Sequence, residues 1–198
     1  MRRLRYYYII QLQYLGFRFH GWQKQPKISA TIEQELITAL SKIADEPINI
    51  VCAGRTDKGV HALGQVIHFD AAKPRTAMNW LQGVNKLLPS SIKLQWALPV
   101  EASFHARYSA RARSYRYIIY NHEVSHPLLH DRVWWVKKRL DAQLESMQIA
   151  AKHWIGEHDF SSFRDSQCQA STPYRRLLHF QVIRCGNFIL VDIVANAF

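Results

Sequence analysis

The sequence predicts an α+β fold made of two pseudo-symmetric βαββαβ halves, each with helices on one face of an antiparallel sheet. Three observations lead to this fold class. First, 48% of the 198 residues are hydrophobic, which is enough for a buried core. Second, strand-like segments alternate along the chain with segments of helical periodicity. Third, the order of these segments begins again in the second half, so we expect domains at residues 1–102 and 103–198.

In the first half, strands are predicted where β-branched and aromatic residues gather, at residues 6–13, 48–54, 64–69 and 92–98. One helix begins after Thr31, whose hydroxyl pairs with Gln34 in a capping box, and it ends before Pro47. A second helix is predicted at residues 76–88, closed by Pro89. The resulting order is the ferredoxin-like arrangement.

The second half starts the same order again. Strands are predicted at residues 113–120 and, as a short extra strand, 133–136, followed by a helix at residues 140–154. A hairpin follows, with strands at residues 177–184 and 188–194. Because the closing helix and strand of a βαββαβ unit are missing, we expect this half to be incomplete at its C-terminus and treat the chain as a truncated form.

Charge is more informative than hydrophobicity. The chain has 26 Lys and Arg against 15 Asp and Glu, a net charge of +11, which is typical of a protein that binds a polyanion such as nucleic acid. No segment approaches the ~20 apolar residues of a transmembrane helix, so no membrane association is expected. The basic start of the chain is followed by a strand-like segment rather than by the apolar core of a signal peptide. We therefore expect a cytoplasmic protein.

Cysteine and histidine residues do not point to a metal site. Cys52, Cys168 and Cys185 are odd in number and far apart, so we expect buried thiols rather than disulfides or a metal knuckle. Three histidines of residues 122–130 recur every four residues, but Pro127 interrupts the helix that this spacing would need. The sequence therefore predicts no metal.

The segment Gly54-Arg55-Thr56-Asp57-Lys58-Gly59-Val60-His61 lies between two predicted strands of opposite direction. It would place the Asp57 carboxylate at the rim of a sheet between Arg55 and Lys58, and both cations favour its ionised form. Such a carboxylate can act as a nucleophile or a base, and the cations can hold phosphates. A plain turn is the alternative, since the same residue types often form turns.

This segment resembles the signature of the TruA family of tRNA pseudouridine synthases. The resemblance continues at other motifs of this sequence, which are Gly21-Trp22-Gln23, Gln65-Val66-Ile67-His68-Phe69, Phe104-His105-Ala106-Arg107-Tyr108-Ser109-Ala110, Arg113-Ser114-Tyr115-Arg116-Tyr117, Asp159-Phe160-x-Ser-Phe163 and Val191-Asp192-Ile193-x-Ala-Asn196-Ala-Phe198. It extends from about Tyr7 to the last residue, and it makes the turn-only interpretation of Asp57 a minor one.

The resemblance implies a cofactor-free isomerase that converts uridine to pseudouridine at positions 38 to 40 of the tRNA anticodon arm and works as a homodimer. It makes Asp57 the catalytic aspartate, which attacks either the uracil ring or the ribose. It also makes Arg55 the residue that assists base flipping and pairs with the aspartate, and Tyr115 the residue that stacks on the target base. Flipping a base out of its stack costs a few kcal/mol, and stacking on an aromatic ring offsets part of it.

Four further cations are candidate RNA contacts: Lys58, Arg107, Arg111 and Arg113. In a strand, Arg111, Arg113, Tyr115 and Tyr117 share one face, which would suit RNA backbone and base stacking. The alternative is a half-buried strand whose tyrosines belong to the core and whose arginines are solvated. Two interpretations also remain for Arg107, which is either a phosphate contact or a surface charge.

The sequence departs from the family in three places. The family continues after Ala-Asn-Ala-Phe into a helix with a Met-Val-Arg-Asn-like run, whose arginine packs beside the aspartate, and into a final strand. If these are absent, apolar faces of the sheet should lie uncovered. Leu15-Gly16 stands where an Asp-Gly turn is usual, and Ser171 stands where an arginine is common.

Three functions remain open from the sequence. The first is an active tRNA pseudouridine synthase. The second is an RNA-binding module of the same fold that is catalytically impaired or inactive. The third is a different RNA-modifying enzyme that uses Asp57, which the specificity of the motif makes remote.

Overall fold

The computed structural model describes residues 4–26, 30–164 and 172–198. The chain forms two compact units, Met1–Ala110 and Arg111–Phe198. Each unit combines one β-sheet with α-helices, which confirms the α+β class. Residues 103–110, which the sequence assigns to the second half, lie within the first unit. The division of the chain into two repeat halves stays a prediction.

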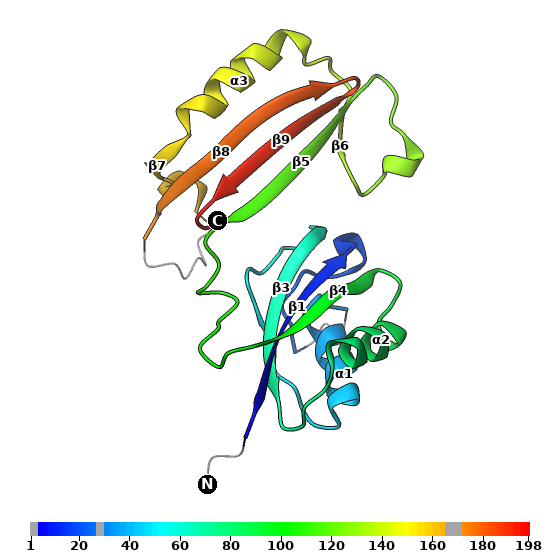
Figure 1. The fold of residues 1–198 in the computed structure, drawn as a ribbon. Coiled ribbons are helices and arrows are strands. Elements are labelled where there is room, and N and C mark those ends of the chain that lie inside the picture. Colours follow the sequence, from blue (N-terminus) through cyan, green and yellow to red (C-terminus); the bar gives the residue numbers. More distant parts are fainter. Residues whose placement is uncertain (1–3, 27–29, 165–171) are drawn as a thin grey trace. The chain divides into compact units, whose positions relative to one another are not determined.

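The first unit has a four-stranded sheet in the order β2-β3-β1-β4, in which all neighbours are antiparallel. Its elements are β1 (Tyr6–Tyr14), the short 3-10 helix η1 (Gly16–Arg18), α1 (Ile32–Ala44), β2 (Val51–Cys52), β3 (Ala62–Ala71), α2 (Ala77–Leu87) and β4 (Ile92–Val100). The two helices lie side by side on one face of the sheet (Figure 1). Among residues 4–26 and 30–110, no α-helix lies on the other face.

Alternation along β1 explains which face the helices cover. Tyr8, Ile10 and Leu12 are buried and belong to the main hydrophobic cluster, whereas the residues between them are half-buried. The cap predicted for α1 is half formed, because the Thr31 hydroxyl accepts a bond from the Gln34 amide at 3.3 Å. The Gln34 side chain bonds forward to Thr38 instead of back to the cap.

The strand predicted at residues 48–54 is shorter than expected, since only Val51–Cys52 pairs with β3. Ile48 and Ile50 are buried in the core, as a strand would require. However, the Ile48 amide donates to the Ser41 hydroxyl of α1 at 2.9 Å. The segment is thus bonded to the helix above it before it reaches the sheet.

The second unit has a five-stranded sheet in the order β6-β5-β9-β8-β7. The β5–β6 pair is parallel and the other pairs are antiparallel. The elements of this unit are β5 (Arg113–Asn121), η2 (Pro127–Leu129), β6 (Trp134–Val136), η3 (Asp141–Gln143), α3 (Leu144–His153), β7 (Gly156–Asp159), η4 (Ser161–Phe163), β8 (Tyr174–Cys185) and β9 (Phe188–Ala195). The predicted hairpin is confirmed, with Cys185 opposite Phe188 and Gly186 in the turn at φ +57°.

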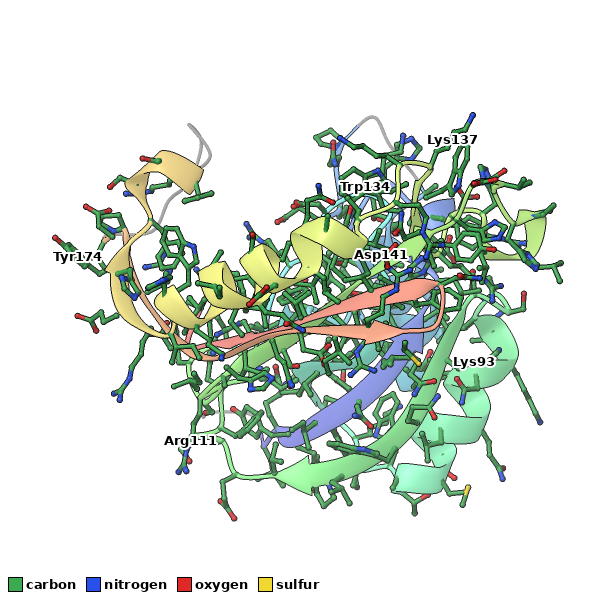
Figure 2. The ribbon with its side chains drawn as sticks, turned by 90° about the horizontal axis from the view of Figure 1, so that it is seen from above. Lys93, Arg111, Trp134, Lys137, Asp141 and Tyr174 are labelled. Atoms are coloured by element: carbon green, nitrogen blue, oxygen red, sulfur yellow. The ribbon has the colours of Figure 1, made fainter. Side chains whose placement is uncertain are left out.

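Within residues 111–164 and 172–198, one α-helix covers this sheet. α3 lies along β8 (Figure 1), and its apolar side chains pack on a small cluster formed by Ile119, Ala151, Val182 and Ile189. Asp141 lies at the N-terminal end of α3 and Tyr174 at the opposite end of the helix (Figure 2). The cluster is therefore confined to the part of the sheet that α3 reaches.

A buried asparagine holds the connection between β5 and α3. The Asn121 side chain is fully buried; its amide nitrogen donates to the Val136 and Lys138 carbonyls at 2.9 and 2.7 Å. Its amide oxygen accepts from the Leu140 amide at 3.0 Å and from Arg184 at 3.1 Å. This bond at Leu140 and the 3-10 turn after it explain why α3 begins later than the predicted residue 140.

Candidate active site

The Asp57 loop, residues 53–61, connects β2 to β3 at the rim of the first sheet. The Ala53 amide still bonds to the Val66 carbonyl at 2.8 Å, and beyond it the chain leaves the ladder. Arg55, Asp57 and Lys58 are all exposed in this loop. Asp57 thus lies where the sequence predicts it, at a strand end facing solvent.

Backbone contacts fix the loop from one side. The Trp22 amide donates to the Thr56 carbonyl at 2.9 Å, and the Val60 amide donates to the Asp57 carbonyl at 3.2 Å. Gly21 precedes Trp22 with φ +84°, and a Cβ at this position would lie 3.0 Å from the Thr56 oxygen. Only glycine combines that backbone conformation with this close approach. The Gly21-Trp22 motif is therefore a support of the Asp57 loop.

A buried polar network fixes the loop from below. The Tyr14 hydroxyl lies 2.8 Å from the Thr56 hydroxyl, and the Gln65 amide nitrogen donates to the Gly54 carbonyl at 2.6 Å and to Tyr14 at 3.3 Å. Tyr14 and Gln65 are only 3% and 8% exposed, so these bonds are shielded from water. Shielded and mutually polarised hydrogen bonds hold a single geometry more firmly than exposed ones.

The far end of the loop rests on η1. The Gly16 amide donates to Nδ1 of His61 at 3.1 Å, and a Cβ at Gly16 would overlap the Val60 carbonyl oxygen. The Leu15-Gly16 departure from the family turn therefore keeps the glycine that this contact needs. Leu15 itself is partly exposed, and its amide bonds to the Ser91 carbonyl at 2.9 Å.

The cations beside Asp57 do not pair with it. Within the described residues, no hydrogen bond or ion pair engages the carboxylate of Asp57, including from Arg55 or Lys58. The carboxylate is thus available to a ligand. Arg55 and Arg107, although distant in sequence, both act electrostatically on the thiol of Cys52, so the structure brings these two predicted residues into one neighbourhood.

The remaining predicted residues belong to the second unit. Arg111 lies in the connection that precedes β5 (Figure 2), and Arg113 begins that strand. Arg113 donates to the Asn196 carbonyl at 2.9 Å, and the Tyr115 ring meets the Phe198 ring edge-on at 4.7 Å. The structure therefore brings the strand motif of β5 together with the Ala-Asn-Ala-Phe motif.

The alternation of β5 places its tyrosines on the apolar face of the second sheet. Tyr115 pairs with Ile193 and Tyr117 with Val191, and the same face continues to the buried Ile119. Because α3 covers β8, the β5 side of this face is open, and Tyr117 is 54% exposed. On the opposite face Arg116 forms a bidentate pair with Asp192 at 2.6 and 2.7 Å, which holds the pKa of Asp192 below its usual value.

The cysteine prediction is wrong for one residue. Cys52 is half-buried, and burial raises the pKa of its thiol to about 11. Cys185 is exposed, because it ends β8 at the tip of the hairpin, where no element covers it. Cys168 and Ser171 lie outside the described residues.

Metal-ligand clusters and membrane-spanning helices are both absent from the described part of the chain. Residues 4–26, 30–164 and 172–198 contain no group of His, Cys, Asp or Glu that could hold a metal ion. None of the helices found in those ranges is long and apolar enough to cross a membrane.

An exposed carboxylate on a firmly supported loop, in a chain of net charge +11, is typical of an enzyme that acts on a polyanion. The comparison with known proteins names the family. The family model for tRNA pseudouridine synthase matches residues 10–109 and 150–198. The chain therefore belongs to the tRNA pseudouridine synthase family, whose members are isomerases.

Individual relatives agree with the family model. The protein named tRNA pseudouridine synthase A of Cronobacter sakazakii is 49% identical over 187 residues, which is 94% of this chain and 68% of the relative. The protein of the same name from Hydrogenovibrio crunogenus is 49% identical over 189 residues, covering 96% of this chain and 71% of the relative. A Paraburkholderia phytofirmans protein of that name is 48% identical over 187 residues, 94% of this chain and 68% of its own length.

Proposed function

We propose that this chain converts uridine to pseudouridine in the anticodon stem-loop of tRNA, at positions 38 to 40, with Asp57 as its catalytic residue and no cofactor. The observation that carries the proposal is the Asp57 loop, in which a carboxylate without a protein partner is held on a buried hydrogen-bond network. The relatives named tRNA pseudouridine synthase A support tRNA as the substrate.

The reaction is an isomerisation, so it consumes and produces nothing else. Asp57 attacks either the uracil ring or the anomeric carbon of the ribose, and the bond between the base nitrogen and the sugar breaks. The base turns in the active site and its C5 bonds to the sugar carbon. The bond that Asp57 made is displaced by C5 if it was to the sugar, or is eliminated afterwards if it was to the ring, which restores the free carboxylate. C5 releases a proton while the freed nitrogen takes one up. Because no electrons enter or leave, no redox cofactor is required.

The other residues are assigned by the needs of this reaction. Arg55 assists flipping of the target uridine and approaches Asp57 when RNA is bound, and Tyr115 stacks on the flipped base. The cations that contact the RNA backbone are Lys58, Arg107, Arg111 and Arg113.

We further propose that the two units derive from two ferredoxin-like halves, 1–102 and 103–198. The order β2-β3-β1-β4 with both helices on one face supports this for the first half. The succession of β5, α3, β8 and β9 supports it for the second, with β6 and β7 as additional edge strands. We expect a homodimer that acts in the cytoplasm, where tRNA is modified.

The first test maps pseudouridine by position in an unmodified tRNA transcript. The chain should form product in the anticodon arm, and Asp57→Asn should abolish the product while tRNA binding is kept. Asp45→Asn is the matched control, because Asp45 is an exposed aspartate of the same unit whose left-handed backbone (φ 60°) suits asparagine. Product that persists in Asp57→Asn would refute the catalytic assignment.

Absence of product from the chain itself has a defined follow-up. The relatives are longer than the matched segment, so a chimera that carries the C-terminal segment of one relative is tested next. Asp57-dependent product in the chimera would keep the assignment of the site. No product in either protein, with tRNA binding intact, would leave an RNA-binding module.

Salt dependence tests the proposed phosphate contacts. The logarithm of the binding constant should fall linearly with the logarithm of salt concentration, and each substitution of a contacting Lys or Arg by Ala should lower that slope by about 1. Lys58→Ala and Arg111→Ala are the first variants, since both side chains are exposed. Slopes equal to that of the parent would contradict these contacts.

A further inference from the structure

We propose that Tyr108, stacked on His105 and flanked by Arg107, forms a second stacking site that takes an unpaired base of the RNA outside the reaction pocket. These three residues are called the Tyr108 platform. The inference rests on the proposed function in one respect, which is that the ligand is RNA.

The first observation that supports the proposal is the geometry of the Tyr108 ring. The ring is stacked on the His105 imidazole with centroids 4.2 Å apart and an interplanar angle of 22°. Tyr108 is nevertheless 78% exposed, the highest exposure of any aromatic side chain among the large exposed hydrophobic residues described. A single exposed apolar side chain is ordinary. An exposed ring that is already fixed by stacking is different, because it can take a base with little further loss of side-chain entropy.

The turn that carries the platform is itself tied down. The Ser109 amide donates to the His105 carbonyl at 2.7 Å, and the Tyr108 amide donates to Nδ1 of His105 at 3.3 Å. The Ala106 amide donates to Nδ1 of His68 on β3 at 3.0 Å, and Ala106 is buried. The platform is thus attached to the sheet of the first unit.

His68 connects the platform to the sheet through a tilted ring contact. Its ring lies 4.8 Å from the ring of His105, and burial, followed by the nearby charge of His105, lowers the pKa of His68. A neutral His68 keeps Nδ1 as the acceptor for Ala106. Asp70 opposes the shift, and it is the acidic neighbour that acts on this imidazole.

Charge complementarity selects RNA as the occupant. The Arg107 guanidinium lies 6.0 Å from the centroid of the Tyr108 ring. Proteins that bind single-stranded nucleic acid combine aromatic stacking surfaces with neighbouring cations in this way. Arg107 and Arg55 both act on the Cys52 thiol, together with the opposing charge of Glu33. The platform and the Asp57 loop therefore share one basic edge of the first unit.

The platform and the Asp57 loop are attached to different positions of β3. Gln65 holds the base of the loop, and His68, to which the platform is bonded, lies three residues further along β3, which is about 10 Å of strand. Because the proposed function assigns the target base to Tyr115, a base on Tyr108 is another nucleotide than the target. Its contribution should appear in binding and not in the chemical step.

The experiment compares tRNA binding and turnover in single variants of the whole chain, with an unmodified tRNA transcript as the probe. Tyr108→Ala should raise Kd and KM at least about 5-fold, as for the loss of one stacked base, with kcat unchanged. Tyr108→Phe should bind like the parent, because the ring face is kept. Met78→Ala, a truncation of another large exposed side chain of the first unit, on α2, is the control and should change neither constant.

Salt dependence separates stacking from charge. Tyr108→Ala should leave the salt slope of binding unchanged, whereas Arg107→Ala should lower it by about 1. A thermal melt of each variant checks the fold, and His105→Phe, which keeps a ring under Tyr108, should retain binding if the turn is intact. Unchanged Kd and KM in a folded Tyr108→Ala protein would overturn the platform.

Failure of the platform and failure of the proposed function give different results. Binding is therefore also measured in the Asp57→Asn background. If product forms but Tyr108→Ala leaves KM and Kd unchanged, the platform is wrong and the function stands. If no product forms while tRNA binding still depends on Tyr108, the platform is supported without the proposed reaction.

Discussion

The two units of the chain are stabilised in different ways. In the first unit, α1 and α2 cover one face of the sheet, and large side chains such as Trp22, Phe69 and Trp80 are almost completely buried. In the described part of the second unit, α3 is the one α-helix that covers the sheet, and the hydrophobic cluster consists of Ile119, Ala151, Val182 and Ile189 with half-buried neighbours. Aromatic side chains such as Trp134 and Tyr117 remain more than half exposed there.

The difference between the two units shows which side chains are held most firmly in place. The unit with the deep core also holds the Asp57 loop, through Tyr14 and Gln65, which are both buried. The second unit depends more on hydrogen bonds, above all those of Asn121. The firm support suits the catalytic role that we propose for Asp57, and the looser one is compatible with the RNA contacts that we propose for the second unit.

The largest expected effect comes from removing a core indole. Trp80→Ala should destabilise the first unit by about 3–5 kcal/mol, because its ring packs edge-on against Tyr8 and Phe69 at 5.3 and 5.0 Å. The matched change in the second unit, Trp134→Ala, should cost less than about 1 kcal/mol, since Trp134 is 57% exposed. Urea unfolding measures both. Equal losses would contradict the contrast between the two cores.

The next effect tests the polar support of the second unit. Asn121→Ala should cost roughly 2–3 kcal/mol, because it removes a fully buried amide and leaves the Val136 and Lys138 carbonyls and the Leu140 amide without their partner. Gln181→Ala, which removes an exposed amide from β8, is the control and should change stability by less than about 0.5 kcal/mol. If the two variants unfold alike, Asn121 is not the clamp that its bonds indicate.

A substitution at Gly16 should cause a smaller loss of stability but a large loss of turnover. Gly16→Ala forces the Val60 carbonyl away and should cost about 1–3 kcal/mol, and the displaced Asp57 loop should lower kcat by about 100-fold. Gly186→Ala provides the comparison in the second unit. It has no neighbour within 4 Å but a φ of +57°, so it should cost about 1–2 kcal/mol and leave kcat unchanged. Normal turnover in a folded Gly16→Ala protein would show that the loop tolerates displacement.

The reactivities of Cys52 and Cys185 allow the two units to be compared without changing their stability. In a Cys168→Ser background at pH 8, a maleimide should label Cys185 quickly, because this thiol is exposed. Cys52, with a pKa of about 11, has a thiolate fraction of only about 0.1% at that pH and should react at least about 100-fold more slowly. The Cys52 rate should rise as the pH approaches 11. Equal rates at pH 8 would contradict the burial of Cys52.

Most elements could be predicted because their local signals are strong. The alternation in β1 and the periodicity of α1 and α2 are both local, and both were found within a few residues of the predicted bounds. The strand β7 (Gly156–Asp159) was not predicted, because the segment is short and polar. It becomes a strand by pairing with β8 at the edge of the second sheet, which no local pattern reveals. The late start of β2, at Val51 instead of residue 48, depends on the bond from Ile48 to Ser41, which no local pattern reveals either.

The same division holds for the site. Asp57 and its flanking cations were found from one contiguous motif. Their support could not be found in this way, because Tyr14, Trp22 and Gln65 meet the loop only through the register of β1 and β3. The assignment of the exposed cysteine failed for a related reason, since the exposure of Cys185 follows from its place at a hairpin tip.

The position of Trp22 has a practical consequence for following the enzyme in real time. Its amide holds the Thr56 carbonyl, and its indole lies 6.1 Å from the Tyr14 ring that holds the Thr56 hydroxyl. Any displacement of the Asp57 loop must therefore change the surroundings of this one indole. Fluorine placed on that ring would give a resonance that records opening and closing of the loop during turnover, while the reacting groups stay chemically untouched.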